Sequence, residues 1–292
     1  MASWSVATFA LLEAAVREDV GSGDVTTQLT VPPGLRGAAR ILTREAGVMA
    51  GGTVAAWVFQ RIDGELAVEA REDGVALEAG SELLGVSGSV ASILTAERLA
   101  LNFLARLCGI ATLTRAFVSS IRGTGARILD TRKTTPGWRE LERAAVRAGG
   151  GDNHRAGLFD AVLVKENHVH AAGGVALAWR AASGALAGRP VPAFVQIEVR
   201  DVRELAEALN AGARRILLDN FSREELTQAV REARAAAPAA VLEASGGVTA
   251  ANVRSIAETG VDLISIGALT HSARALDLTL LLEGLGSPRM AR

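Results

Sequence analysis

This chain contains one cysteine, two lysines and almost no net charge. The shortages of cysteine and of net charge exclude or disfavour particular bonds and partners. The single cysteine, Cys108, excludes an intrachain disulfide and fits a reducing compartment. It lies in an apolar stretch, which predicts a small core residue and not a nucleophile. The formal net charge of −1 gives no general reason to expect nucleic acid or an anionic membrane surface as a partner.

Membrane-spanning and dinucleotide-binding signals are also missing. No run of about 18 uncharged apolar residues exists, so no spanning helix is expected. Residues 1–20 carry charges at helical spacing where a signal peptide would be apolar, which predicts a cytoplasmic protein. No G-x-G-x-x-G follows the first strand of the α/β region described below, which disfavours a dinucleotide-binding fold.

Lysine is used only twice among the 31 basic residues, at Lys133 and Lys165. Arginine presents a wide planar fork, whereas lysine is a compact point charge. Both lysines come just after short β-like apolar runs, where barrel enzymes place catalytic groups. This placement favours a role in an active site over chance survival of two lysines in an arginine-rich chain.

From about residue 126, short aliphatic runs alternate with helical patterns. Such an alternation predicts a parallel sheet built from βα units. Six units with helices between them predict a closed or nearly closed α/β barrel, and an open doubly wound sheet is the alternative. Ser222, with Glu225 three residues later, predicts a capping box at the start of one helix. The expected strands are 127–130, 161–164, 194–198, 215–219, 240–243 and 263–266.

The first hundred residues have a different character. Strand-like pieces at 41–48, 54–59, 66–69 and near 83–86 are broken by glycines, and helical patterns at 8–17 and 93–107 bracket them. This pattern predicts a smaller N-terminal α+β domain over 1–107, followed by the barrel over 108–272. The apolar tail, 273–292, is expected to pack back on the first domain.

Polar residues follow the predicted barrel strands, whose carboxyl ends meet at one rim. A basic wall suits a small polyanion because arginines grip carboxylates through two hydrogen bonds. Two carboxylates on successive strands suit Mg²⁺, which keeps other positions for water and phosphate. Salt bridges across the rim are the alternative. The basic wall is Arg132, Lys133, His154, Arg155 and Lys165, and the acidic wall is Glu198 and Asp219.

Glycine turns follow the fifth and sixth strands. Ser245-Gly246-Gly247 precedes a helix opened by Thr249, and Gly267-Ala268 precedes Thr270. Glycine-lined turns at helix N-termini bind phosphate through backbone N–H groups, although ordinary tight turns have the same composition. A polyanion pocket, a magnesium site and a phosphate cradle together indicate a sugar-phosphate donor and an anionic acceptor.

Three segments resemble the signature segments of the quinolinate phosphoribosyltransferase family: Asp130–Gly137, Gly149–Arg155 and Lys165–His168. Supporting matches extend the resemblance over essentially the whole chain in the family's motif order. They are Glu18–Thr27, Glu97–Arg98, Leu101–Phe103 and Gly109–Thr112.

The resemblance implies a reaction in de novo NAD biosynthesis. The ring nitrogen of quinolinate attacks C1 of phosphoribosyl pyrophosphate, pyrophosphate leaves, and the 2-carboxylate is lost as CO₂, giving nicotinate mononucleotide. It also implies Mg²⁺ and a homodimer or dimer-based hexamer. No nucleic acid or membrane partner is implied.

The resemblance also implies residue roles. Lys133, Lys165, Glu198 and Asp219 form the catalytic set, and the last two would hold the metal. The quinolinate carboxylates would be held by Arg98 from a neighbouring subunit, Arg132, His154, Arg155 and Lys165. The donor would be bound by Lys133, Glu166, Ser245, Gly246, Gly267 and His271. The family often has Asp where this chain has Glu166.

Three alternatives remain. A paralogue associated with molybdate-transport loci shares this fold, and the intact Asp130–Lys133 and Lys165–His168 segments argue against it. A Schiff-base aldolase would also place lysines at strand ends, and borohydride trapping would reveal it. A non-catalytic anion-binding module would gain nothing from the carboxylates of Glu198 and Asp219.

Overall fold

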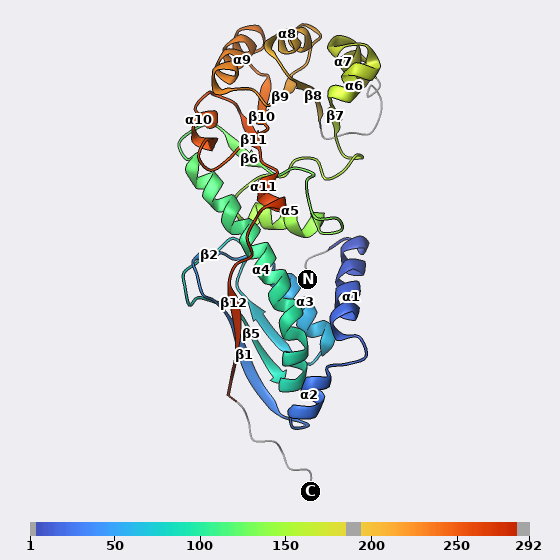
Figure 1. Cartoon of the computed structure of the whole chain (residues 1–292), viewed down its shortest axis with the longest axis vertical. Helices are drawn as coiled ribbons and strands as arrows, with labels where there is room; N and C mark the ends of the chain where they lie inside the picture. The colour runs from blue at the N-terminus through green and yellow to red at the C-terminus, as the bar shows by residue number, and fades with distance from the viewer. Residues whose placement is uncertain (1–3, 185–193, 285–292) are drawn as a thin grey trace. The chain divides into compact units, whose positions relative to one another are not determined.

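The computed structural model of the chain describes residues 4–184 and 194–284. The chain forms two compact units. Of the described residues, 4–115, 134–150 and 270–284 form the first unit, while 116–133, 151–184 and 194–269 form the second (Figure 1). Three segments that are far apart in the sequence therefore build the first unit.

The first unit contains a four-stranded antiparallel sheet in the order β12-β1-β5-β3. Leu280 of β12 lies opposite Ile41 of β1, so the segment after Ser272 pairs with the N-terminal part of the chain. Residues 285–292 of the expected tail lie outside the described residues. The strands are β1 (Arg36–Thr43), β2 (Gly47–Val48), β3 (Ala67–Ala70), β4 (Ala76–Leu77), β5 (Glu82–Ser89) and β12 (Leu278–Glu283), and β2 pairs only with β4.

Helices complete the first unit, and the expected helices at 8–17 and 93–107 are confirmed within longer ones. Asp24 caps α2, since its carboxylate accepts a hydrogen bond from the N–H of Thr27 at 3.0 Å. The helices are α1 (Val6–Val20), α2 (Val25–Thr30), α3 (Gly52–Ile62), α4 (Val90–Ser120), α5 (Arg139–Ala148) and the short α11 (Ala268–His271), and α4 and α11 each run across the division between the units.

The expected strand at 54–59 is wrong, because this segment lies inside α3. Its β-branched and aromatic residues favoured a strand. However, Val54 and Val58 are both buried, as are Ala55 and Phe59, so the buried positions repeat at the i, i+4 spacing of a helix. Gly51, with φ of 88°, supplies the left-handed residue from which the helix begins.

Among the described residues, α4 is the one helix whose length and composition would allow it to cross a membrane. Of its most apolar window, 56% is buried within the protein, as in the core helix of a globular unit. The expected boundary after residue 107 falls inside this helix. Residues 134–150 also group with the first unit and not with the barrel. Their contacts with it include the ion pair of Glu142 on α5 with Arg106 on α4.

The second unit contains a six-stranded parallel sheet in the order β6-β11-β10-β9-β8-β7. Each predicted strand is confirmed, with ends within two residues of the observed ones. The strands are β6 (Arg127–Leu129), β7 (Val162–Val164), β8 (Val195–Val199), β9 (Arg215–Asp219), β10 (Val241–Ser245) and β11 (Leu263–Ser265).

The strand order distinguishes a barrel from a doubly wound sheet. Strands β7 to β11 follow one another in a single direction, and the last strand, β11, pairs with the first, β6. A doubly wound sheet would instead reverse its order at a central switch point. Leu129 also makes an isolated parallel bridge to Asp152 beside β6. Over residues 4–184 and 194–284, β6 and β7 do not pair, so the barrel is incomplete there.

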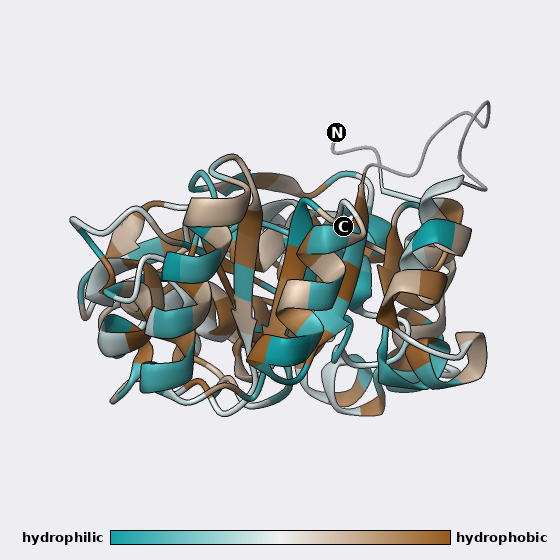
Figure 2. Cartoon of the chain, turned by 90° about the horizontal axis from the view of Figure 1, so that it is seen from above, coloured by the Kyte–Doolittle hydropathy of each residue, from teal (hydrophilic) through white to brown (hydrophobic). Residues whose placement is uncertain are grey.

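The helices of the second unit are amphipathic, with hydrophilic and hydrophobic residues on different sides (Figure 2). On α9, Leu226, Ala229 and Ala233 are buried. The predicted capping box is confirmed: Ser222 Oγ accepts the Glu225 N–H at 3.2 Å, and the Glu225 carboxylate accepts the Ser222 N–H at 2.7 Å. The helices are α6 (Glu166–Ala172), α7 (Val175–Gly184), α8 (Val202–Asn210), α9 (Arg223–Ala236) and α10 (Val253–Ala257).

Candidate active site

The register of the parallel sheet brings several predicted residues to one face. Glu198 lies opposite Leu217, and Asp219, two residues further along the same strand, lies opposite Ser245. Side chains alternate across a strand, so directly paired residues and their i+2 neighbours share a face. Glu198, Asp219 and Ser245 therefore project from the same side at the carboxyl ends of three neighbouring strands.

Lys165 lies beside the acidic wall of Glu198 and Asp219. Its Nζ lies 3.3 Å from Glu198 Oε2, with Lys165 half exposed and Glu198 largely buried. The Lys165 N–H donates to His168 Nδ1 at 2.9 Å, which closes the first turn of α6 around the lysine. Lys165 and Glu198 thus form a salt bridge at the rim, as the alternative interpretation expects. The same salt bridge places Lys165 beside Glu198, one of the two predicted metal ligands.

Asn220 links the ends of β9 and β10. Its φ of 58° is in the left-handed region, which asparagine adopts more readily than most other non-glycine residues. Its N–H donates to the Ser245 carbonyl at 2.8 Å, and its Nδ2 donates to Asp219 Oδ2 at 2.8 Å. Sequence reasoning gave this residue no role, although it holds the Asp219 carboxylate and touches the glycine turn.

Gly246 is required by this contact. Its φ is 94°, and a Cβ built on it would lie 2.1 Å from Asn220 Oδ1. Only a residue without a side chain lets the turn after β10 approach the end of β9 this closely.

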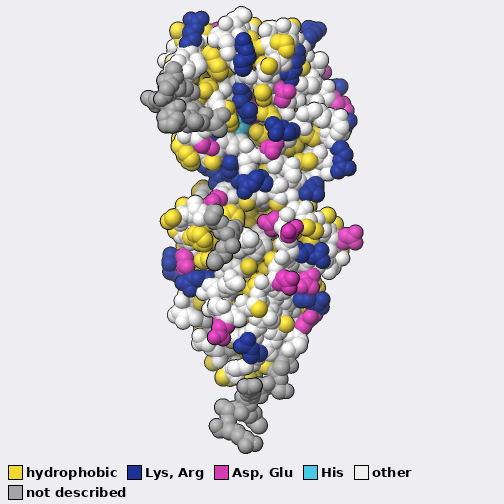
Figure 3. Space-filling model, turned by 180° about the vertical axis from the view of Figure 1, so that it is seen from behind, with side chains coloured by type: hydrophobic (Ala, Val, Ile, Leu, Met, Phe, Trp, Pro, Cys, Tyr) yellow, Lys and Arg dark blue, Asp and Glu magenta, His cyan; other side chains and the backbone are white. Residues whose placement is uncertain are grey.

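Asp130 organises the basic side of the rim. This fully buried carboxylate accepts hydrogen bonds from Asn153 Nδ2 at 2.5 Å and from the His154 N–H at 2.7 Å. It therefore fixes the loop that carries His154 and Arg155. On the face of the second unit shown in Figure 3, Lys and Arg side chains gather around a recessed His.

Arg155 is an almost buried guanidinium, 7% exposed, whose Nη1 donates to the Ala161 carbonyl at 3.2 Å. Burial lowers its pKa, the positive charge of Arg132 lowers this pKa further, and the carboxylate of Asp160 acts in the opposite direction. A bound anion would relieve the repulsion between the two guanidiniums.

His154 is also buried, and both of its ring nitrogens face protein groups. Nδ1 accepts the Arg155 N–H at 2.8 Å, while Nε2 lies 3.4 Å from Oε1 of the fully buried Glu243. Burial by itself raises the pKa of the Glu243 carboxyl. The hydrogen bond and charge of His154, with hydrogen bonds from Gln196 and Ser265, outweigh burial and leave this pKa below its usual value.

Other predicted residues lie elsewhere or have other contacts. Arg98 on α4 and His271 at the end of α11 belong to the first unit. Glu166 begins α6, and its Oε1 lies 2.6 Å from Nη1 of Arg200. The Lys133 N–H donates to Thr131 Oγ1 at 3.0 Å. Within the described ranges, no three His, Cys, Asp or Glu side chains form a group that could hold a metal ion.

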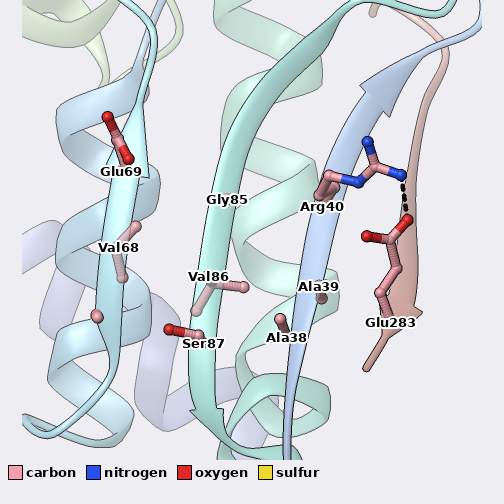
Figure 4. A pocket seen from close by; sticks show the side chains of 10 residues that line it. Ala38, Ala39, Arg40, Val68, Glu69, Gly85, Val86, Ser87 and Glu283 are labelled. Carbon is pink, nitrogen blue, oxygen red and sulfur yellow. Dashed lines mark hydrogen bonds and ion pairs between the residues drawn. The ribbon is translucent and has the colours of Figure 1, made fainter. Parts of the chain in front are cut away.

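A groove of about 600 Å³ crosses the sheet of the first unit (Figure 4). Small residues such as Ala38, Gly85 and Ser87 form its floor, and Arg40 at its side is ion-paired with Glu283. None of its described lining residues is a predicted site residue, so this groove is not the candidate active site.

A barrel sheet whose carboxyl edge carries a basic and an acidic wall defines an α/β-barrel enzyme for small anionic substrates. The family models for the C-terminal and N-terminal domains of quinolinate phosphoribosyl transferase match residues 110–281 and 24–108. The chain belongs to the quinolinate phosphoribosyltransferase family, and the resemblance noted in the sequence is thereby confirmed.

Individual relatives support the same assignment. A nicotinate-nucleotide pyrophosphorylase (carboxylating) of Mycobacterium leprae is 44% identical over 270 residues, covering 91% of this chain and 94% of the relative. Quinolinate phosphoribosyltransferase (decarboxylating) 1 of Nicotiana glauca is 40% identical, covering 94% and 81%. The structure of the nicotinate-nucleotide pyrophosphorylase of Francisella tularensis superposes with a TM-score of 0.87 at 38% identity, covering 95% and 96%.

Proposed function

We propose that this chain transfers the phosphoribosyl group of phosphoribosyl pyrophosphate to quinolinate at the carboxyl edge of the second unit's sheet. The products are nicotinate mononucleotide, pyrophosphate and CO₂, so the enzyme is a decarboxylating pentosyltransferase. The observation that carries the proposal is the almost buried guanidinium of Arg155 beside the charge of Arg132, at the same rim as the carboxylates of Glu198 and Asp219.

Quinolinate is a planar dicarboxylate and suits the basic wall. Arg132 and Arg155 offer fork-shaped donors, each able to bind one carboxylate through two hydrogen bonds. Lys165, whose Nζ already neutralises Glu198, adds a point charge between the two walls. This arrangement orients the ring nitrogen toward the acidic wall, where the ribose of the donor would lie.

The acidic wall suits Mg²⁺ bound together with the donor. Glu198 and Asp219 provide two carboxylates, and Mg²⁺ commonly takes one or two protein carboxylates plus phosphate oxygens and water. When bound, the ion neutralises charge on the departing pyrophosphate. The same carboxylates favour the positive charge that develops at C1 of the ribose. The donor's phosphates would meet Lys133, Glu166, Ser245, Gly246, Gly267 and His271.

Decarboxylation needs no further cofactor. Once the ring nitrogen carries the ribose, its positive charge stabilises the electron pair that departing CO₂ leaves on C2, and C2 then takes up a proton to give nicotinate mononucleotide. The protein has to hold the 2-carboxylate and exclude water, and the burial of Arg155 supports a site that does both. The enzyme would act in the cytoplasm as a homodimer or dimer-based hexamer, with Arg98 contributed across the subunit interface.

The test is a CO₂-release assay with carboxyl-labelled quinolinate. Release should require both phosphoribosyl pyrophosphate and Mg²⁺, with one pyrophosphate formed per CO₂. Turnover of nicotinate without CO₂ release would contradict the assignment. Irreversible trapping by borohydride with a carbonyl substrate would instead point to Schiff-base chemistry at Lys133 or Lys165.

A further inference from the structure

Glu243 is a charged residue in an unusual place. It lies in the middle of β10, is fully buried, and is opposite Leu217, which is also opposite Glu198. Glu243 therefore shares the sheet face of the candidate site, two residues before Ser245 at the rim. Barrel interiors are usually filled by aliphatic side chains at such positions. A buried carboxylate is costly unless it is paired and hydrogen-bonded.

The partners of Glu243 form a polar cluster beneath the rim. Gln196 Nε2 donates to its Oε2 at 2.9 Å, and Arg215 Nη2 lies 3.9 Å from the same oxygen. Arg215 Nε also donates to Gln196 Oε1 at 3.3 Å. Phe194 stacks against the Arg215 guanidinium at 4.1 Å and meets the His154 ring edge-on at 5.4 Å. The second carboxylate oxygen, Oε1, is buried, accepts no hydrogen bond from the described residues and lies 3.4 Å from His154 Nε2.

The His154 ring connects this cluster to the quinolinate pocket. Nδ1 accepts the Arg155 N–H, and Nε2 lies 3.4 Å from Glu243 Oε1. The ring therefore stands between the buried carboxylate and the backbone of Arg155.

Building on the proposed function, we propose that Glu243 is a positioning residue for quinolinate binding. Its Oε1 faces His154 Nε2 and fixes the ring orientation that receives the Arg155 N–H, and so it sets the direction of the Arg155 guanidinium.

Kinetics separate this role from simple loss of stability. Glu243→Ala should raise the KM for quinolinate about 10- to 100-fold, since displacing a binding group by about 1 Å can cost 10²-fold. The KM for phosphoribosyl pyrophosphate should stay within about 3-fold, because no donor contact changes. Glu243→Gln keeps an oxygen for the His154 Nε2–H and should recover most of the quinolinate affinity.

Asp262→Asn is the matched control. Asp262 Oδ2 accepts the N–H of Leu242, the neighbour of Glu243 on β10, at 2.7 Å, but it lies before β11 at the opposite end of the strands. It should lower stability without separating the two KM values. An equal rise of both KM values in Glu243→Ala, or an unchanged KM for quinolinate, would overturn the proposal.

A spectroscopic readout covers the case in which Glu243→Ala fails to fold. Protein labelled with ¹⁵N-histidine contains four rings, and the His154 signals are those missing from His154→Asn. Glu243→Gln should shift the His154 signals, whereas Asp262→Asn should leave them unchanged. Unchanged His154 signals in Glu243→Gln would refute the contact on which the positioning role rests.

The two His154 variants add a further comparison. In His154→Asn the side-chain oxygen can still accept the Arg155 N–H, whereas His154→Phe cannot, so Asn should preserve the KM for quinolinate better. If wild-type protein releases no CO₂ from quinolinate, the proposed function fails, while the His154 signals still test the contact with Glu243. If wild-type turns over and Glu243→Ala shows no KM separation, only the positioning role fails.

Discussion

The guanidinium of Arg106 donates to the carboxylate of Glu142 at 3.0 Å, and Glu142 is fully buried in the first unit. Arg106 Nη1 also donates to the Ala273 carbonyl at 2.8 Å, and Thr135 donates to Glu142 through its N–H at 3.1 Å and its hydroxyl at 2.9 Å. One ion pair therefore joins α4, α5, the loop that follows Lys133 and the segment that follows α11.

Glu142→Ala should lower the free energy of unfolding by about 1–3 kcal/mol, because it removes the charged partner of the partly buried Arg106 and leaves the Thr135 donors without their acceptor. Glu142→Gln should cost less, since the amide oxygen still accepts hydrogen bonds. Urea unfolding followed by circular dichroism measures both. Glu258→Ala is the control: it breaks the exposed Arg254–Glu258 pair and should change stability by about 0.5 kcal/mol or less.

The Arg106–Glu142 pair illustrates which part of the fold could not be predicted from the sequence. Aliphatic runs and helix caps are local patterns, and they predicted all six barrel strands and the Ser222–Glu225 cap. The grouping of 134–150 with the first unit depends on contacts between residues far apart in the sequence, such as Arg106 and Glu142, 36 residues apart, and Ser5 and Glu140, 135 residues apart. No local pattern reports such a contact. At 54–59 the β-branched residues favour a strand, although Val54 and Val58 have the spacing of a helix. The strand expected there is therefore wrong.

Arg155→Ala and Lys165→Ala should each raise the KM for quinolinate or nearly abolish turnover. A lost hydrogen bond to a charged group is worth about 1.5–3 kcal/mol, which corresponds to about 10- to 100-fold. Arg231→Ala provides the comparison, because Arg231 is exposed on α9 and away from the sheet edge. Steady-state CO₂ release at varied quinolinate measures all three. Wild-type KM values in both Arg155→Ala and Lys165→Ala would contradict the assignment of the basic wall.

Glu198→Gln should weaken activation by Mg²⁺ and lower kcat/KM for phosphoribosyl pyrophosphate by about 10²-fold, because it removes a charge aimed at the developing cation. The amide oxygen can still accept a hydrogen bond from Lys165, so the KM for quinolinate should change much less. Initial rates at varied Mg²⁺ and fixed substrates measure the activation constant. Glu232→Ala on the outer helix α9 should leave it unchanged, and an unaltered constant in Glu198→Gln would argue against metal binding there.

Only part of the candidate site could be predicted from the sequence. Short segments placed Asp130, Lys165 and Glu198 at strand ends, and the sheet register then put Glu198 and Asp219 on one face. The role of Asn220 depends on its left-handed φ and on the approach of Gly246, which composition does not report. Glu243 left a weak signal, a single charge within the aliphatic run 240–244, but its contact with His154 crosses 89 residues.

Cys108 should be unreactive in the folded protein. Burial raises the pKa of its thiol to about 12, and the thiol is fully buried, with its Sγ 3.3 Å from the Ala50 carbonyl. The thiolate is the reactive form, so almost none exists at pH 8. Ellman's reagent should therefore release about one equivalent of thionitrobenzoate per chain only after guanidinium is added. Rapid labelling without denaturant would show that this part of the core opens readily.

Gly246→Ala and Gly247→Ala form a matched pair that tests the contact between β9 and β10. Both glycines have positive φ, 94° and 59°, so both variants bear the backbone strain of a left-handed alanine, about 1–2 kcal/mol. Only at Gly246 would the new methyl group meet Asn220, at 2.1 Å from Oδ1, because the space around Gly247 is open.

The methyl group in Gly246→Ala must displace Asn220, whose Nδ2 holds the carboxylate of Asp219. Gly246→Ala should therefore lower kcat/KM for phosphoribosyl pyrophosphate by about 10²-fold, as expected for a shift of about 1 Å in a binding group. Gly247→Ala should lose stability to a similar extent but far less activity. Urea unfolding and initial rates at varied donor concentration separate the two effects. Equal activity losses in both variants would mean that strain in the turn, and not the position of Asn220, controls binding of the donor.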